Sequence, residues 1–67
     1  MTTTATPFHE RLRAARGRLG LTQTELAALS GLSWLTVSHL ETGAANPRLD
    51  TMEKLAQALQ VRVKDLV

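Results

Sequence analysis

A segment in the middle of the chain places small and turn-forming residues between two helix-start signals. Thr22-Gln23-Thr24-Glu25 is a capping box, Gly31 follows about two helical turns later, and Ser33 can cap a new helix. Ala27 lies four residues before Gly31. Two helices cross closely at a steep angle only where the first carries a small residue and the connection turns sharply, as glycine allows. The segment Gln23 to Thr42 therefore predicts a helix-turn-helix.

The apolar residues of this segment have the spacing that such a motif needs. Counted from Gln23, the small, turning and buried positions are the fourth, fifth, ninth, tenth, fifteenth and eighteenth, which are Leu26, Ala27, Gly31, Leu32, Val37 and Leu40. Ser30, at the eighth position, is a mild departure from the usual apolar residue. Two ordinary packed helices would explain the apolar stripe, but they would not require Ala27 and Gly31 four apart between two caps.

The rest of the chain predicts an all-α fold with one small core. With 67 residues and no cysteine, the fold must be stabilised by apolar packing, and with Phe8 and Trp34 as the two aromatics, that core consists of Leu, Val, Ala and Met. We expect five helices and no strand. We expect a flexible leader over residues 1–5 and one domain over residues 6–67. Thr6 is predicted to cap the first helix. The predicted helices are Pro7–Leu19, Gln23–Ser30, about Ser33–Thr42, Leu49–Gln60 and a last turn over Lys64–Leu66. Leu19, Leu29 and Leu49 are expected on the apolar faces of their helices.

Charge and hydropathy narrow the function without deciding it. The net charge is +2, and the first predicted helix carries Arg11, Arg13, Arg16 and Arg18 against Glu10. Such a cluster suits phosphate contact, but it equally describes a solvated helix face. No apolar run reaches the ~18 residues that a membrane span needs, and residues 1–6 lack the apolar stretch of a signal peptide. We therefore expect a cytoplasmic protein.

The chain from Leu12 to Val61 reads LRAARGRLGLTQTELAALSGLSWLTVSHLETGAANPRLDTMEKLAQALQV. This stretch resembles the Cro/cI repressor family, also called the Xre family. The resemblance implies a five-helix, lambda-repressor-like domain, generally dimeric, whose third helix enters the major groove of double-stranded DNA at a two-fold operator. It also implies a transcriptional regulator, for which we expect the role of a repressor. It assigns base reading to Ser33, Trp34, Leu35, Ser38 and His39, and phosphate contact to Gln23 and to the neighbourhood of Thr42. The predicted DNA-binding residues further include Thr22, Thr36 and Arg48.

A helical projection gives a second prediction for the third helix. At ~100° per residue with Val37 facing the core, Leu40, Glu41 and Trp34 lie toward or beside the interior, and Leu35, His39 and Thr42 point outward. Trp34 and Leu35 stand where the family usually has polar residues that bond base edges, so we expect weak direct readout. Leu35 can instead pack on thymine methyl groups, Ser38 or His39 can reach a purine, and DNA shape can contribute the rest. Trp34 completing the core and Leu35 contacting a protein are the open alternatives.

Arg16 and Glu41 are predicted to form a partly buried ion pair. Arg16 lies at the edge of the first helix's apolar stripe and Glu41 on the inward flank of the third helix, and the resemblance favours the pairing. The alternative is two separate surface charges. Glu41 is also the one formal charge between Gly31 and Pro47. Phosphate affinity is therefore expected from backbone N–H groups at helix starts, with Gln23, Ser33, Arg48 and the arginines of the first helix.

Other functions have less support. There is no glycine-rich phosphate loop, nucleophile elbow or His, Cys and carboxylate cluster, so we expect no enzyme, no cofactor and no metal site. The rival hypothesis is a protein-interaction module on the same fold, an antitoxin or adaptor, using Trp34 and Leu35. Within the DNA-binding class, repressor, restriction controller and antitoxin stay open. A dimer is predicted from the apolar C-terminal residues Val61, Val63, Leu66 and Val67.

Overall fold

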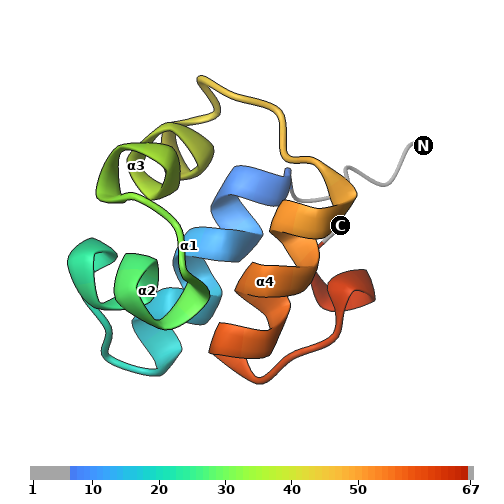
Figure 1. The fold of residues 1–67 in the computed structure, drawn as a ribbon. Coiled ribbons are helices and arrows are strands. Elements are labelled where there is room, and N and C mark those ends of the chain that lie inside the picture. The colour runs from blue at the N-terminus through green and yellow to red at the C-terminus, as the bar shows by residue number, and fades with distance from the viewer. Residues whose placement is uncertain (1–6, 67) are drawn as a thin grey trace.

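A computed structural model describes residues 7–66, which contain helices and no strand (Figure 1). The elements are α1 (Phe8–Arg18), α2 (Gln23–Ser30), α3 (Trp34–Thr42), α4 (Leu49–Leu59) and a 3₁₀ turn, η1 (Val63–Asp65). The all-α fold class is confirmed, with a single 3₁₀ turn in place of the fifth helix. The leader predicted at residues 1–5 and the cap predicted at Thr6 lie outside the described residues.

Helix α1 is shorter at both ends than the sequence predicts. Pro7 has an extended backbone, with φ −61° and ψ 154°, so it is the N-cap and Phe8 is the first helical residue. The helix ends at Arg18, and Gly20 follows in the left-handed region with φ 69°, where a residue without Cβ fits. Leu19 therefore lies past the end of the helix, and it is 47% exposed instead of buried in the apolar stripe.

One apolar core holds the helices together. Helix α2 packs on α3 and α4, α1 packs on α3, and η1 packs on α4. In Figure 1, α2 and α3 lie on one side of the molecule and α4 lies on the other. The core residues are Leu12, Ala15, Leu26, Ala27, Val37, Leu40, Leu55, Ala56, Leu59 and Leu66. The predicted core of Leu, Val and Ala is confirmed, but within residues 7–66 it contains no methionine, since Met52 is half-buried and lies outside it.

Two leucines expected on apolar faces lie at the surface. Leu29 is 60% exposed and Leu49 is 62% exposed. On α2, Ser30 is buried in place of Leu29, and its hydroxyl donates to the backbone carbonyl of Leu26 at 2.7 Å. That hydrogen bond satisfies the buried hydroxyl, so the departure from an apolar residue is tolerated. Leu49 is the first residue of α4, well before Leu55, the first buried residue of that helix.

The chain leaves α4 through a left-handed residue other than glycine. Gln60 has φ 59° and forms the C-cap, so α4 ends at Leu59, one residue before its predicted end. The N–H of Val61 donates back to the carbonyl of Ala56 at 3.0 Å, which closes the last turn. The turn η1 then brings Leu66 into the core, where it is 1% exposed. The C-terminal segment therefore covers the end of the core.

Candidate nucleic-acid interface

The predicted elbow between α2 and α3 is present. The Thr22 hydroxyl accepts the backbone N–H of Glu25 at 3.0 Å, and the Glu25 carboxylate accepts the N–H of Thr22 at 2.8 Å. Gly31 has φ 74°, and the N–H of Leu32 donates to the carbonyl of Ala27 at 3.0 Å. Because both ends of α2 are held by local hydrogen bonds, the direction in which α3 starts is well defined.

Helix α3 has a buried side and an exposed side, as the projection predicts. Val37 and Leu40 are in the core. Leu35, His39 and Thr42 are exposed, and the exposed fraction of Leu35 is 54%. An outward leucine on a helix that also carries exposed polar residues is free to contact another molecule.

Trp34 does not complete the core, so that alternative is wrong. Its side chain is 52% exposed, beside Leu35 at 54%. Trp34 is the first residue of α3 and precedes the first buried residue of the helix, Val37, by almost one turn. At that position even a side chain on the inward flank extends beyond the core. We call the exposed residues Trp34, Leu35, His39 and Thr42 the outer face of α3.

Arg16 of α1 and Glu41 of α3 form a two-pronged ion pair. Arg16 Nε lies 2.5 Å from Glu41 Oε2, and Nη2 donates to Oε1 at 2.9 Å. The Glu41 side chain is 1% exposed and that of Arg16 is 20% exposed. The hydrogen bonds to Glu41 raise the pKa of the Arg16 guanidinium above its usual value, against the opposing effect of burial. Nη1 also donates to the carbonyl of Leu21 at 2.7 Å, so Arg16 ties α3 to the α1–α2 connection.

Gln23 belongs to the same cluster, which sequence reasoning missed. Its side-chain nitrogen Nε2 donates to Glu41 Oε1 at 3.0 Å. Gln23 is the first residue of α2 and Glu41 lies near the end of α3, so no local pattern links them. A helical projection of α3 could not reveal this hydrogen bond, because it does not include the packing of α2 on α3.

The outer face of α3 carries no formal charge. The one charge between Gly31 and Pro47 is Glu41, and it is buried in the ion pair. Positive charge lies instead on α1 and before α4, at the exposed residues Arg13, Arg18 and Arg48. Arg13 Nη1 donates to the backbone carbonyl of Glu41 at 3.5 Å, and Arg48 is the N-cap residue of α4.

Most hydroxyl groups among the predicted DNA contacts already bond to their own helices. The Ser33 hydroxyl accepts the N–H of Thr36 at 3.1 Å and lies 2.8 Å from the Thr36 hydroxyl. The Thr42 hydroxyl donates to the carbonyl of His39 at 3.1 Å. The predicted role of these residues, and of the half-buried Ser38, in DNA contact stays a prediction.

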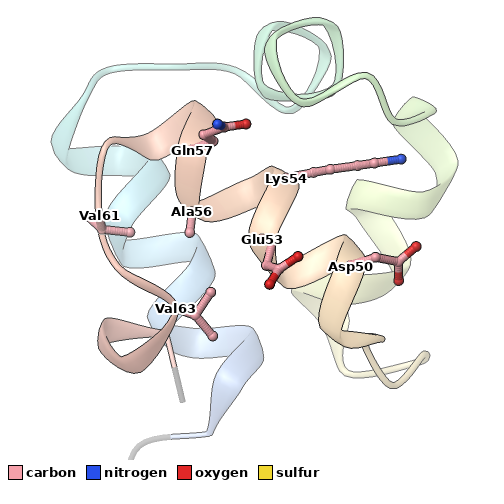
Figure 2. A pocket seen from close by; sticks show the side chains of 7 residues that line it. All are labelled: Asp50, Glu53, Lys54, Ala56, Gln57, Val61 and Val63. Atoms are coloured by element: carbon pink, nitrogen blue, oxygen red, sulfur yellow. The ribbon is translucent and has the colours of Figure 1, made fainter.

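The predicted dimer surface needs a correction. Leu66 is buried in the core of its own chain because η1 turns it inward, and Val67 lies outside the described residues. Val61 and Val63 are half-buried. They line one side of an open groove along α4, seen in Figure 2, whose lining residues are Asp50, Glu53, Lys54, Ala56, Gln57, Val61 and Val63.

The described range, residues 7–66, contains neither a side-chain cluster for a metal ion nor a membrane-spanning helix. No group of three or more His, Cys, Asp and Glu side chains lies close enough together there to hold a metal ion. No helix in the same range has both the length and the apolar character required to cross a bilayer.

The sequence matches a helix-turn-helix family model over residues 12–66. An HTH-type transcriptional regulator of Archaeoglobus fulgidus is 39% identical over 56 residues, which cover 84% of this chain and 80% of that protein. The HTH-type transcriptional repressor RghR of Bacillus subtilis is 39% identical over 61 residues, covering 90% of this chain and 45% of RghR. The chain thus spans most of the first relative and less than half of the second.

Solved structures show the same fold. The restriction-modification controller protein C.AhdI of Aeromonas hydrophila superposes with a TM-score of 0.87 at 42% identity, covering 90% of this chain and 91% of that one. The P22 c2 repressor, solved in complex with a synthetic operator, superposes with a TM-score of 0.87 at 28% identity, covering 94% of this chain and 96% of that one.

Proposed function

The chain belongs to the helix-turn-helix family of the Cro/cI type, and we propose that it regulates transcription by binding double-stranded DNA with α3 in the major groove. The observation that carries this proposal is the outer face of α3. Its side chains are exposed on a helix whose start is set by the Gly31 elbow and whose inner side is anchored by the Arg16–Glu41 pair. The operator complex of P22 c2, which has the same fold, supports it.

The residues of α3 favour an apolar and shape-dependent reading of DNA. Leu35, at 54% exposure, fits contact with thymine methyl groups in the major groove. His39 and Ser38 supply the polar groups that can bond a purine edge. Because this surface has no formal charge, DNA shape and deformability contribute the rest of the specificity.

Phosphate contacts come from helix starts and from arginines outside α3. Gln23 and Trp34 are the first residues of α2 and α3, where backbone N–H groups point out of the helix. Arg48 and the exposed arginines of α1 add positive charge. Binding should therefore weaken as salt rises, by the release of condensed counterions.

Fluorescence anisotropy with a random duplex tests the proposal. We expect binding at ~50 mM salt that weakens clearly at ~200 mM salt, since each phosphate neutralised contributes about −0.9 to the slope of log K against log salt. No binding at micromolar protein at either salt concentration would contradict the proposal. Selection of bound duplexes from a random pool would then identify the operator.

We propose a homodimer that pairs two half-sites, formed through the groove along α4. Val61 and Val63 supply an apolar strip, and Asp50, Glu53 and Lys54 supply charges of both signs beside it (Figure 2). A two-fold contact can pair such charges reciprocally. Sedimentation should show a dimer on DNA, and a strict monomer both free and bound would contradict it.

The second candidate is a protein-interaction module. Trp34 and Leu35 are both more than half exposed and uncharged, as a protein contact would favour. The same anisotropy assay separates the two functions, because only DNA binding responds to the duplex. Among the roles of DNA-binding relatives we favour repression, carried out in the cytoplasm and without catalysis, a cofactor or a metal.

A further inference from the structure

The Glu41 carboxylate is shared between an arginine of α1 and a glutamine of α2. Arg16 occupies both carboxylate oxygens, and Gln23 Nε2 donates to Oε1 at 3.0 Å. Glu41 is 1% exposed, while Gln23 is half-buried. Gln23 is thus the partly solvent-facing member of a cluster whose centre is closed to water.

The chemistry of the cluster determines which way the Gln23 amide points. A carboxylate held by arginine accepts hydrogen bonds and donates none, so the amide nitrogen, not the amide oxygen, must face Glu41. One of the two Nε2 hydrogens is used in this bond. The second remains a donor, and the neutralised Arg16–Glu41 pair adds little net charge to repel an anion nearby.

The start of α2 offers more donors at the same place. The backbone N–H groups of Gln23 and Thr24 have no acceptor within residues 7–66, whereas the next N–H, that of Glu25, is capped by Thr22. These free groups lie at the positive end of the α2 dipole. With its amide nitrogen held in place, Gln23 adds a side-chain donor to them.

We propose that Glu41 is a positioning residue for DNA binding, which holds the Gln23 amide so that its free N–H and the start of α2 together grip one phosphate oxygen. This inference rests on the proposed function and adds to it the buried group that sets the donor's direction. It also explains why α3 buries a carboxylate beneath a DNA-binding surface, where a negative charge would otherwise be unfavourable.

A double-mutant cycle tests the coupling, with binding to a random duplex measured by anisotropy over a range of salt. Gln23→Ala should weaken binding about ten-fold, which is ~1.4 kcal/mol, with an unchanged salt slope because the amide is neutral. Glu41→Gln leaves the Arg16 charge uncompensated in either background, so that effect cancels in the cycle. If Glu41 positions Gln23, the loss of DNA affinity caused by Glu41→Gln should be about five-fold larger when Gln23 is present than in the Gln23→Ala background.

The outcomes separate this inference from the proposed function. Wild-type binding with equal effects of Glu41→Gln in the two backgrounds would overturn the positioning role alone. Absence of salt-dependent binding by the wild type would overturn the proposed function. Gln60→Gly is the matched control, since it removes a glutamine at a left-handed C-cap that glycine accepts, and it should leave affinity unchanged.

A measurement on the wild type decides the case if Glu41→Gln does not fold. In side-chain amide NMR spectra, one Nε2 hydrogen of Gln23 should exchange slowly and the other should shift when duplex is added. The exposed amide of Gln60 serves as the internal reference. Two equally exchanging Gln23 hydrogens that do not respond to DNA would overturn the inference.

Discussion

The two sides of α3 differ in a way that is opposite to most surface helices. The inner side buries a carboxylate, Glu41, next to Val37 and Leu40, whereas the outer face exposes Trp34 and Leu35 and carries no formal charge. Amphipathic helices usually show the reverse, with charge outside and apolar side chains inside. The difference shows that the charge of this helix ties it to α1 and α2, and it leaves the outward apolar residues exposed for the contact that we propose.

The two sides also have different partners. The inner side is held by directional bonds from Arg16 of α1 and Gln23 of α2. Within residues 7–66, the side chains of the outer face make a single hydrogen bond, from the Thr42 hydroxyl to the carbonyl of His39. Substitutions on the inner side should therefore change stability and orientation, and substitutions on the outer face should change binding.

The largest expected effect comes from Glu41→Ala. Removal of the carboxylate leaves Arg16 partly buried without its counter-charge, which should lower the free energy of unfolding by about 3 kcal/mol. For a domain of this size, the melting temperature should fall by roughly 12 °C or more. Thermal unfolding followed by circular dichroism measures it. Glu53→Ala, which removes an exposed glutamate of α4, is the control. An equal loss of stability in both variants would contradict the structural role of the inner side of α3.

Gly31→Ala tests the elbow that presents the outer face. A Cβ at Gly31 meets nothing within 4 Å, so the cost is the left-handed backbone with φ 74° and not a clash. We expect a loss of about 1–2 kcal/mol in denaturant unfolding. Gly17→Ala, at the next-to-last residue of α1 and with open space around an added Cβ, should instead gain about 0.5–1 kcal/mol. No loss of stability for Gly31→Ala would show that the elbow does not require its left-handed glycine.

Leu35→Ala has the smallest expected effect and the most specific one. Binding to a selected, thymine-containing half-site should weaken about five-fold through lost methyl contact, with stability changed by less than ~0.5 kcal/mol. Anisotropy and thermal unfolding give the two values. Leu29→Ala, on the exposed side of α2, should leave both nearly unchanged. A large stability loss for Leu35→Ala would mean that the outer face is structural.

Local signals made much of the fold predictable. The capping box at Thr22, the cap at Ser33 and the turn at Gly31 each involve groups only a few residues apart, and the structure has all three. The first helix boundary was less accurate, because Pro7 can serve as either the cap or the first helical residue. A partner for Arg16 was suggested by the family resemblance as well as by the pattern.

Placement relative to distant elements was not predictable in the same way. Leu29 and Ser30 are adjacent on α2, and only the packing of α2 on α3 and α4 decided that the serine faces inward. The sequence predicts Leu66 as a dimer contact, but η1 turns it into the core. It also predicts Trp34 toward or beside the interior, but Trp34 is exposed because the first residue of α3 lies beyond the core. The Gln23–Glu41 bond joins two helices and leaves no pattern in the sequence.

Taken by itself, the order of residues determined where α2 and α3 begin and where the chain bends between them, because capping and left-handed turns depend on neighbours within about one helical turn. The tertiary structure decided which side chains meet: the sharing of Glu41 by Arg16 and Gln23, and the exposure of Trp34 and Leu35. Burial and long-range hydrogen bonds depend on groups that only packing brings together.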